Sequence, residues 1–514
     1  MVLALIVAVV LVGAVDAFAP SGQSNPRLRD ESFRPVRMLP MLSAVLGLVW
    51  YIRAAREGRA RLARRIGIGA ALATTALALA PVVMTGPRPL NRQPSPDAQE
   101  YADATRQLAS GNGYVTTFRG GVAQPPRYPP GFSVALAPFA ALGPYPAAVQ
   151  LGSMVYAMLY VIAVVGAAWV IGGPLAAAVA GALVGTSPFA LRLGSLVMSD
   201  AFAAGLTMAS LALVHRAGGA RAGGSPVGGA AGSSGAAGSS GAAEAVNRGI
   251  GGAGLAGVLA GAVAGALVTV RLSAIVQIPG LLIGLTNRQR AAILLAAAPF
   301  IVALGLFQWA TFGSPFRTGY HYWLPEIQNF ALGYPLDAEL RRDGSGVVGD
   351  ALDGALVQWA RPWPDDDPVR AFRSIAFYPL VLLGAFWIFA PPLTTLPGLV
   401  YVWRHRREPA AGFALWLVAG SLVFYLFYFY MGARFMAAPA SALAVFTGVA
   451  VVRWAERVAH GRHAAREAGG PDAVAPGAVV PDAVAAAAPS GTGAASAEKR
   501  GVTRTASRPG NQVP

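Results

Sequence analysis

The sequence predicts an all-α protein, a polytopic bundle of about ten to twelve transmembrane helices with two long outer loops. Three observations support this fold class. Hydrophobic residues make up 55% of the 514 residues and charged residues only 12%, about half the charged share of soluble proteins. Apolar runs of about 20 residues recur along most of the chain. The arginines form short clusters beside these runs, where membrane topology places them.

Charge and cysteine content exclude several functional classes. A formal charge of +16 would suit a nucleic-acid-binding protein, but arginine clusters beside apolar runs indicate topology signals, so we expect no nucleic-acid partner. Because the chain has no cysteine, it forms no disulfide framework, thiolate nucleophile or cysteine-ligated metal centre. Any catalysis therefore uses oxygen and nitrogen groups. Abundant Ala, Gly, Pro and Arg are typical of a GC-rich bacterial genome.

The apolar runs define the expected spans. In the first half they lie near 1–19, 39–52, 66–86, 145–171, 173–189 and 191–214. In the second half they lie near 250–270, 272–286, 291–311, 374–402, 411–431 and 435–453. The runs 39–52 and 272–286 are short, since a crossing helix needs about 20 residues. The first run lacks a basic segment ahead of it, which favours an uncleaved span over a signal peptide.

Arginine placement predicts the orientation, because basic residues in short loops stay on the cytoplasmic side. Three clusters mark that side: Arg53, Arg56, Arg59, Arg61, Arg64 and Arg65; Arg288 and Arg290; and Arg404, Arg406 and Arg407. Alternating spans then place the loops 87–131 and 312–373 outside. We therefore expect a multi-pass protein of the bacterial inner membrane whose functional loops face the periplasm or the exterior.

Composition divides the chain into five regions. Residues 1–65 contain the N-terminal spans and a basic cytoplasmic loop, and 66–216 and 250–453 contain the two halves of the main membrane domain. Residues 217–249 are rich in Gly, Ala and Ser and predict a flexible linker. Residues 454–514 predict a disordered cytoplasmic tail. We expect no chemistry in either of these last two regions.

The first outer loop contains a helix start. Ser95 is a typical N-cap and Pro96 suits the first helical position. Asp97 then falls in the first turn, with Glu100 and Tyr101 on its face. Two interpretations stay open, because Asp97 is either a functional carboxylate or a charge that complements the helix dipole.

The same loop ends on Arg127, Tyr128 and the sequence ProProGly at 129–131. A rigid diproline beside a cation and an aromatic ring suits an element that holds the loop against the membrane. An ordinary turn at a membrane boundary would have the same residues, so both interpretations stay open.

Asp200 lies in the apolar sequence LeuValMetSerAspAlaPheAlaAla, in the outward half of its expected span. A carboxylate that faced lipid at the bilayer centre would cost a few kcal/mol, so Asp200 should face a polar cavity, which it could share with Asp97. The alternative is that Ser199 and Asp200 simply cap a helix that starts at the interface.

Further candidate ligands come from cations and aromatic rings on the outer side. Arg317 opens the second outer loop with Tyr320 and His321, while Arg271 and Arg434 lie at outer span ends. Arginine binds phosphate through a fork of hydrogen bonds, and aromatic rings pack on sugars. Interfacial anchoring and snorkelling are the alternatives. The lone histidine does not indicate a metal, and Asp365, Asp366 and Asp367 indicate a solvated loop.

In their order along the chain, these motifs resemble those of membrane-embedded glycosyltransferases of the dolichyl-phosphate-mannose protein mannosyltransferase type, glycosyltransferase family 39, and of their bacterial aminoarabinose-transferase relatives. The resemblance covers about residues 66–453. It rests on Asp97 with Tyr101, GlyAsnGlyTyr at 111–114, ArgTyrProProGly at 127–131, SerAsp at 199–200, and PheGlySerPro with ThrGlyTyr at 312–320. Two extra N-terminal spans and the 217–249 segment depart from the family pattern.

The resemblance implies a GT-C fold and a polyprenyl-phosphate-linked sugar as donor. It also implies that Asp97 is the catalytic base of the first outer loop, and Asp200 looks like the family's next acidic residue. Arg271, Arg317 and Arg434 match no family motif, and charge and side alone suggest that they bind the donor phosphate. Glu100, Tyr101, Arg127, Tyr128, Tyr320 and His321 are the further candidates for substrate binding.

The expected function is thus an inverting transfer of a sugar to an acceptor hydroxyl of a protein, lipid or polysaccharide. No general acid is needed, because a phosphate leaving group is a weak base. A divalent metal is compatible with this chemistry, although no motif indicates one. The alternatives are a secondary transporter, in which Asp200 and the outer arginines form a path, and a non-catalytic envelope assembly protein.

Overall fold

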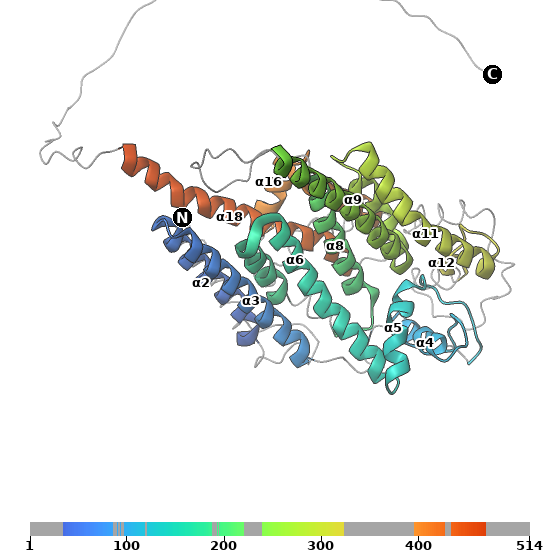
Figure 1. Ribbon diagram of the computed structural model, residues 1–514. Helices are drawn as coiled ribbons and strands as arrows, with labels where there is room; N and C mark the ends of the chain where they lie inside the picture. The colour runs from blue at the N-terminus through green and yellow to red at the C-terminus, as the bar shows by residue number, and fades with distance from the viewer. Residues whose placement is uncertain are drawn as a thin grey trace, which may run out of the picture. The chain divides into compact units, whose positions relative to one another are not determined.

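The computed structural model describes residues 34–85, 90, 93, 97–118, 121–187, 193, 195–219, 239–322, 395–426 and 433–468. The regular elements of these residues are all helices (Figure 1), and the one β-bridge among them pairs Thr116 with Gln124. The chain divides into a unit of residues 1–463, which holds the site described below, and a unit of residues 464–514. The expected all-α class is confirmed.

Six helical segments of the described residues are long and apolar enough to cross a membrane: Met38–Arg56, Ala60–Val83, Ala147–Thr186, Ala253–Val270, Asn287–Phe312 and Arg434–His460. Three shorter apolar helical segments accompany them: Gly131–Leu142, Leu272–Leu281 and Pro409–Tyr425. The chain is therefore a multi-pass membrane protein. The expected span 1–19 and most of the expected span 374–402 lie outside the described residues.

The first helices form a hairpin whose small residues let the backbones approach closely. Helix α2 (Arg34–Arg56) covers the short run 39–52, and α3 (Ala60–Thr85) follows a turn at Gly58. A Cβ added to Gly47 would collide with Ala70, so this contact requires glycine. Such small-residue contacts are typical of helix packing in membranes, where the lipid is as apolar as a leucine side chain.

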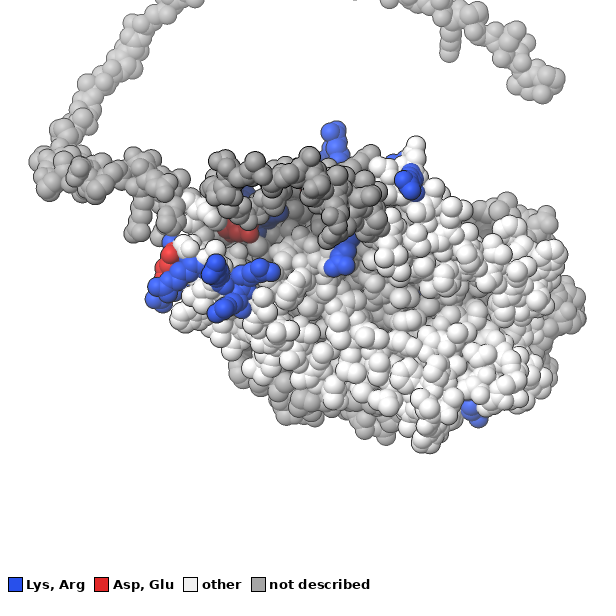
Figure 2. Space-filling model, in the orientation of Figure 1, with Lys and Arg blue, Asp and Glu red and all other residues white. Residues whose placement is uncertain are grey.

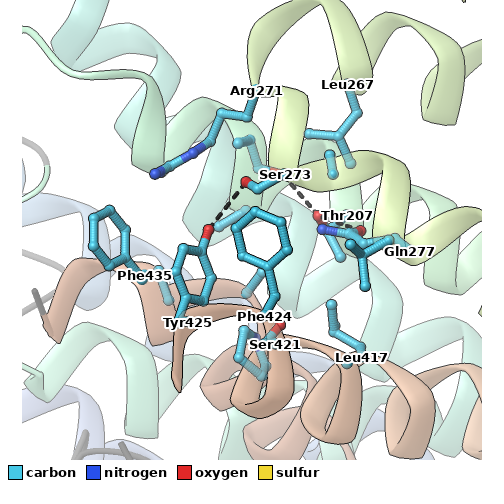
Figure 3. Close-up of a pocket in the computed structure, with 18 of the residues that line it drawn as sticks. Thr207, Leu267, Arg271, Ser273, Gln277, Leu417, Ser421, Phe424, Tyr425 and Phe435 are labelled. Atoms are coloured by element: carbon cyan, nitrogen blue, oxygen red, sulfur yellow. Dashed lines mark hydrogen bonds between the residues drawn. The ribbon is translucent and has the colours of Figure 1, made fainter. Parts of the chain in front are cut away.

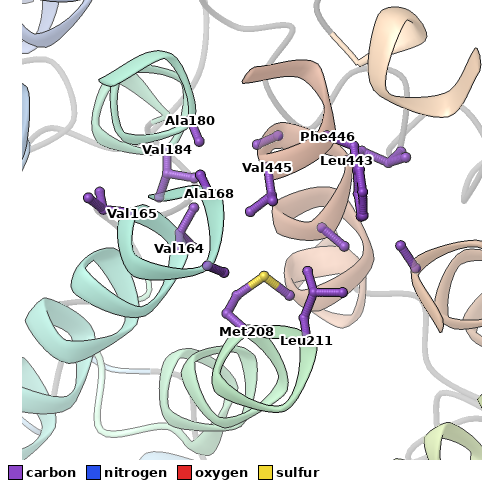
Figure 4. Close-up of a cluster of buried hydrophobic side chains, with 14 of the residues drawn as sticks. Val164, Val165, Ala168, Ala180, Val184, Met208, Leu211, Leu443, Val445 and Phe446 are labelled. Atoms are coloured by element: carbon purple, nitrogen blue, oxygen red, sulfur yellow. The ribbon is translucent and has the colours of Figure 1, made fainter. Parts of the chain in front are cut away.

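Helix α6 (Ala147–Thr186) contains both expected spans 145–171 and 173–189. Its helix breaks at Gly173, which has a φ of 81° and precedes Pro174. A Cβ added to Gly181 would lie 3.0 Å from Val165, so the two arms fold back on each other. Figure 4 shows this core, where side chains of both arms lie beside Met208 and Val445 from two other helices.

The middle of the membrane domain is built from α8 (Ser199–Gly219), α9 (Ser239–Val270) and α11 (Asn287–Phe312). Three glycines of α9 pack in order along α11: Gly257 faces Gln289, Gly261 faces Ile293 and Gly265 faces Ala297. The two helices therefore run parallel, and the chain between them must return to the side from which α9 started.

That return segment corrects one expectation, because residues 272–286 do not form a continuous spanning helix. They contain a short 3-10 helix, η3 (Leu272–Gln277), then the four-residue α10 (Ile278–Leu281) and a left-handed Gly284. Pro279 cannot donate a backbone hydrogen bond, which explains the short elements. Irregular backbone at membrane depth is tolerated where protein buries it or where it lines a cavity. Here Trp416 Nε1 donates to the Val276 carbonyl at 2.7 Å.

The last described helices are α16 (Leu396–Arg404), α17 (Pro409–Leu426), the 3-10 helix η5 (Ala433–Met436) and α18 (Ala437–Ala468). The helix ends do not coincide with the changes in composition. Helix α8 ends at Gly219 and α9 begins at Ser239, both inside the segment 217–249, and α18 continues past residue 454. Residues 220–238 and 469–514 of those regions lie outside the described part.

Basic side chains gather at one end of the membrane unit. In Figure 2 they lie mainly along the upper edge, including the α2–α3 turn. There the side chains of Arg53 and Arg59 are 67% and 64% exposed. The first expected outer loop lies at the opposite end of the view and forms α4 (Asp97–Ala109) and the start of α5 (Gly131–Leu142). Of the second expected outer loop, 312–373, only residues 312–322 are described, and they end in the short α12 (Gly319–Tyr322).

Candidate active site

The first ion pair of the site joins the start of α4 to the start of α18. Asp97 lies in the first turn of α4, as expected, while Ser95 and Pro96 lie outside the described residues. Asp97 Oδ2 accepts a hydrogen bond from Arg434 Nη2 at 2.7 Å, across 337 residues of sequence. The Asp97 side chain is 15% exposed. Asp97 therefore has a specific cationic partner, which a carboxylate that served only the helix dipole would not need.

The second ion pair is the more buried one. Asp200, in the first turn of α8, accepts a hydrogen bond from Arg271 Nη1, and its side chain is only 2% exposed. Arg271 is the N-cap of η3, where α9 ends and the return segment begins. Asp200 thus faces a cation and not lipid. This agrees with the expectation, because an unpaired carboxylate that faced lipid would be costly in free energy.

The two ion pairs are neighbours. The negative charges of both Asp97 and Asp200 act on Arg434. Arg434 Nη1 also lies 3.1 Å from the Met198 sulfur, just before α8. Asp97, Arg434, Asp200 and Arg271 therefore form one cluster of alternating charge, which explains how four ionisable groups remain inside a largely apolar unit.

A third buried pair fixes the loop that precedes α5. Glu100 is 1% exposed, accepts the backbone N–H of Arg127 and lies 3.8 Å from Arg127 Nε. Burial alone would lower the pKa of Arg127, but the negative charge of Glu100, together with Tyr128, Asp97 and Tyr320, outweighs it and the pKa is raised. Both side chains were expected to bind substrate, and in this structure they bind each other.

Aromatic rings join the motif segments. The ring of Tyr101 stacks on that of Tyr128, with centroids 4.5 Å apart, and Tyr128 in turn meets Tyr320 edge-on at 5.7 Å. The Tyr101 hydroxyl also lies 3.1 Å from Ser199 Oγ. Burial raises the pKa of Tyr101, whereas the bond to Ser199 lowers it, and burial dominates. Tyr101 therefore acts as a neutral hydrogen-bonding group.

Two motif glycines allow these segments to meet. A Cβ at Gly131 would collide with Thr269 near the end of α9, and one at Gly319 would collide with the carbonyl oxygens of Pro126 and Arg127. Tyr114, from the GlyAsnGlyTyr motif, donates to the Tyr128 and Pro129 carbonyls at 3.0 and 3.2 Å. The five sequence motifs are thus brought together in one region.

A cavity opens beside the charged cluster, with about 530 Å³ of empty space that includes part of the open solvent. Asp200, Arg271 and Arg434 line one part of it. Figure 3 shows two hydrogen-bonded pairs in its wall, Ser273 with Tyr425 at 3.0 Å and Thr207 with Gln277 at 3.1 Å. The remaining wall is largely apolar and includes Leu267, Leu417, Phe424 and Phe435. The cavity thus combines a cationic part with an apolar part.

Not every expected residue reaches this cluster. Arg317 lies in the turn after α11, and no hydrogen bond or ion pair within the described residues joins its guanidinium to Asp97 or Asp200. The side chain of His321, and Asp365, Asp366 and Asp367, lie outside the described part. Across the described residues, no three His, Asp or Glu side chains gather as a group that could hold a metal ion.

Sequence reasoning missed the cavity residues Ser273, Gln277, Tyr425 and Phe435. No sequence pattern distinguishes polar and aromatic residues that line a cavity from others inside apolar runs. One signal was available, since the run 272–286 was too short for a span and contained Pro279, Gly280 and Gly284. An interrupted apolar segment of this kind points to backbone that lines a cavity.

No family model matches the sequence, and no curated protein matches it either. Solved structures similar to the chain include ArnT from Cupriavidus metallidurans bound to undecaprenyl phosphate, with 16% identity and a TM-score of 0.46. The match covers 76% of this chain and 62% of that one. Another is the archaeal oligosaccharyltransferase AglB from Archaeoglobus fulgidus in complex with an inhibitory peptide and a dolichol-phosphate, with 14% identity and a TM-score of 0.45.

The AglB match covers 78% of this chain and 52% of the archaeal protein. The chain therefore spans less than two thirds of ArnT and about half of AglB. With identities of 14–16% and TM-scores of 0.45 and 0.46, these matches assign no role to any residue of the site.

Proposed function

We propose that this chain is a membrane glycosyltransferase that moves a sugar from a polyprenyl-phosphate donor to an acceptor hydroxyl. One observation carries the proposal, namely that two arginines and two carboxylates meet where an amphipathic cavity begins. A polyprenyl-phosphate sugar has the matching chemistry, because it joins an anion to a long apolar chain. Neither a soluble metabolite nor a simple ion would need both parts of this cavity.

Arg271 and Arg434 are the proposed ligands of the donor phosphate. Guanidinium groups form two parallel hydrogen bonds to phosphate oxygens, which positions the donor and balances its charge. Both arginines line the cavity, where the nearby apolar wall formed by Leu267, Leu417 and Phe424 suits the first part of the lipid chain. This assignment supports donor binding from within the membrane plane.

Asp97 is the proposed base. The acceptor oxygen attacks the anomeric carbon as the bond from that carbon to the phosphate oxygen breaks, and the acceptor proton passes to the Asp97 carboxylate. Polyprenyl phosphate leaves with the bonding electrons, and attack from the opposite side inverts the anomeric configuration. Arg271 and Arg434 stabilise the charge that develops on the leaving phosphate.

Asp97 must be released from Arg434 before it can act as a base. A donor phosphate that binds the Arg434 guanidinium competes with the 2.7 Å bond to Asp97. Donor binding would then free the carboxylate at the moment when it is needed. We propose that Asp200 keeps Arg271 in place during this exchange, since Asp200 is almost fully buried.

We further propose that the site faces the outer side of a bacterial inner membrane. The exposed arginines of the α2–α3 turn support this orientation, because α4 lies at the other end of the membrane unit in Figure 1 and basic loops stay in the cytoplasm. The acceptor is a hydroxyl of a protein, lipid or polysaccharide. No step of this scheme uses a metal ion.

The direct test replaces Asp97 with Asn and measures sugar transfer from a polyprenyl-phosphate donor in membranes with equal amounts of folded protein. We expect transfer to fall by about a hundredfold or more, as for the loss of a general base. Glu57→Gln is the matched control, because Glu57 is an acidic residue at the α2–α3 turn, far along the membrane unit from α4. Undiminished transfer by the Asp97 variant would rule out the proposed base.

One observation favours a second candidate, a secondary transporter. The return segment 271–286 is irregular at membrane depth and carries Arg271 opposite Asp200, and interrupted helices of this kind form transporter sites. The two functions separate in proteoliposomes that contain only this protein. A transferase consumes lipid-linked sugar without moving a solute across the membrane, whereas a transporter moves the solute without forming a glycosidic bond.

A further inference from the structure

Phe435 contacts both arginines of the site. It is the residue after Arg434 in η5 and is 7% exposed. The guanidinium carbon of Arg271 lies 5.4 Å from the centroid of the Phe435 ring, and that of Arg434 also lies 5.4 Å from it. One aromatic ring therefore contacts both Arg271 and Arg434, which lie far apart in the sequence.

The Phe435 ring is itself held in place. Tyr425, from the end of α17, stacks on it with centroids 4.6 Å apart and ring planes within 2°. The Tyr425 hydroxyl lies 3.0 Å from Ser273 Oγ in the return segment, two residues beyond Arg271. Figure 3 shows Arg271, Ser273, Tyr425 and Phe435 on one side of the cavity. The ring, the arginine and the return segment therefore form one connected unit.

Two neighbouring guanidinium groups repel each other, and the low dielectric of a membrane protein strengthens that repulsion. Asp97 and Asp200 offset it in the present arrangement, but Asp97 must leave Arg434 for the proposed reaction. An aromatic face attracts cations through its quadrupole and remains in place when the carboxylate leaves. Phe435 can therefore keep both guanidinium groups close together while the donor phosphate replaces Asp97 at Arg434.

We infer that Phe435 is a positioning residue whose ring aligns Arg271 and Arg434 for a single phosphate group. This role rests on the proposed function, and it makes Phe435 a determinant of donor affinity rather than of proton transfer. A purely structural role would require only an apolar side chain of similar volume. The two roles differ in whether the π-electrons of the ring matter.

The experiment measures the dissociation constant of undecaprenyl phosphate together with donor KM and kcat for the full-length protein and its variants. We expect Phe435→Leu to weaken undecaprenyl phosphate binding and to raise donor KM by about tenfold, with a smaller change in kcat. Phe435→Tyr keeps the aromatic face and should stay within about twofold of the unmodified protein.

Phe446→Leu is the matched control, because Phe446 lies in α18 as a fully buried core residue that lines no part of the cavity. Like Phe435→Leu, it replaces a phenyl ring with a leucine side chain, and it should lower the unfolding temperature without changing donor KM. If Phe435→Leu fails to fold, site-specific mono-, di- and trifluorinated phenylalanine keeps the ring and weakens its quadrupole stepwise. Donor KM should then rise with each added fluorine.

Failure of this inference and failure of the proposed function give different results. If the unmodified protein does not bind undecaprenyl phosphate, the proposed donor is wrong, and the role of Phe435 is wrong with it. If the unmodified protein binds this lipid and the folded leucine or fluorinated variants bind it equally well, only the role of Phe435 is overturned. Loss of kcat with unchanged donor affinity would also overturn it.

Discussion

Arg434 Nη2 lies 2.7 Å from Asp97 Oδ2, so the proposed base is paired with the cation that is proposed to bind the donor phosphate. In the proposed reaction this contact couples donor binding to release of the base, because Arg434 cannot hold both groups in the same fork. A site without this contact would leave Asp97 available to water at all times. The pair therefore makes predictions about both affinity and rate.

Replacement of Arg434 separates its charge from its forked geometry. We expect Arg434→Lys to retain some donor binding and to lose about tenfold in kcat/KM, since lysine offers a point charge instead of two parallel bonds. Arg434→Gln should lose at least about a hundredfold. Transfer assays at several donor concentrations check this order. Equal losses in both variants would mean that the charge of Arg434 contributes nothing.

The Asp200–Arg271 pair predicts a non-additive effect on stability. Because the Asp200 side chain is 2% exposed and that of Arg271 is 20% exposed, Asp200→Ala leaves a largely buried cation and should cost roughly 3 kcal/mol. The double variant with Arg271→Met should recover most of that stability but no transfer activity. Thermal unfolding of the four proteins in detergent measures the cycle, and additive losses would contradict a coupled pair.

Gly131 and Gly319 predict intolerance to a single methyl group. Gly131→Ala places a Cβ against Thr269, and such overpacking should cost about 1–3 kcal/mol and reduce transfer by displacing Arg127 and Tyr128. Gly69→Ala is the control, because the added Cβ there meets nothing within 4 Å. Thermal unfolding and transfer assays check both variants. Full stability of Gly131→Ala would show that α5 and α9 are less closely packed.

The buried loop tyrosines predict sensitivity to alkaline pH. Burial raises the pKa of Tyr128 well above its usual value, and the charge of Asp97 raises it further. Below about pH 10 Tyr128 is neutral in both the folded and the unfolded protein, but above this pH it ionises readily only in the unfolded protein. The stability contribution is therefore present below about pH 10 and is lost as pH rises. As pH rises above about 10, the unfolding temperature of Tyr128→Phe should fall less steeply than that of the unmodified protein. Parallel falls in the two proteins would contradict a contribution from Tyr128.

The absence of cysteine allows a direct test of orientation by single cysteine substitutions. We expect Val122→Cys, at a residue 60% exposed in the first outer loop, to react with a membrane-impermeant thiol reagent in intact spheroplasts. Arg61→Cys, in the first turn of α3, should react only after the membrane is opened. The reverse pattern would place the site in the cytoplasm.

Much of the architecture could be predicted because its causes are local in the sequence. The apolar runs of α3, α6 and α11 are long enough to identify helices on their own, and the break at Gly173 coincides with the first residue of the predicted span 173–189. Asp97, Glu100 and Tyr101 share a face because helical periodicity requires it. The run 272–286 was misassigned because apolarity alone does not distinguish a span from a buried, irregular return segment.

The sequence by itself determined the membrane class, the clustering of arginines, and the five motifs with their candidate carboxylates. Only the tertiary structure decided which charges pair: Asp97 with Arg434, Asp200 with Arg271, and Glu100 with Arg127. It also placed Phe435 beside two arginines. The physical reason is that hydropathy and helical periodicity act over neighbouring residues. Partners such as Asp97 and Arg434, 337 residues apart, meet only when packed helices bring their ends together.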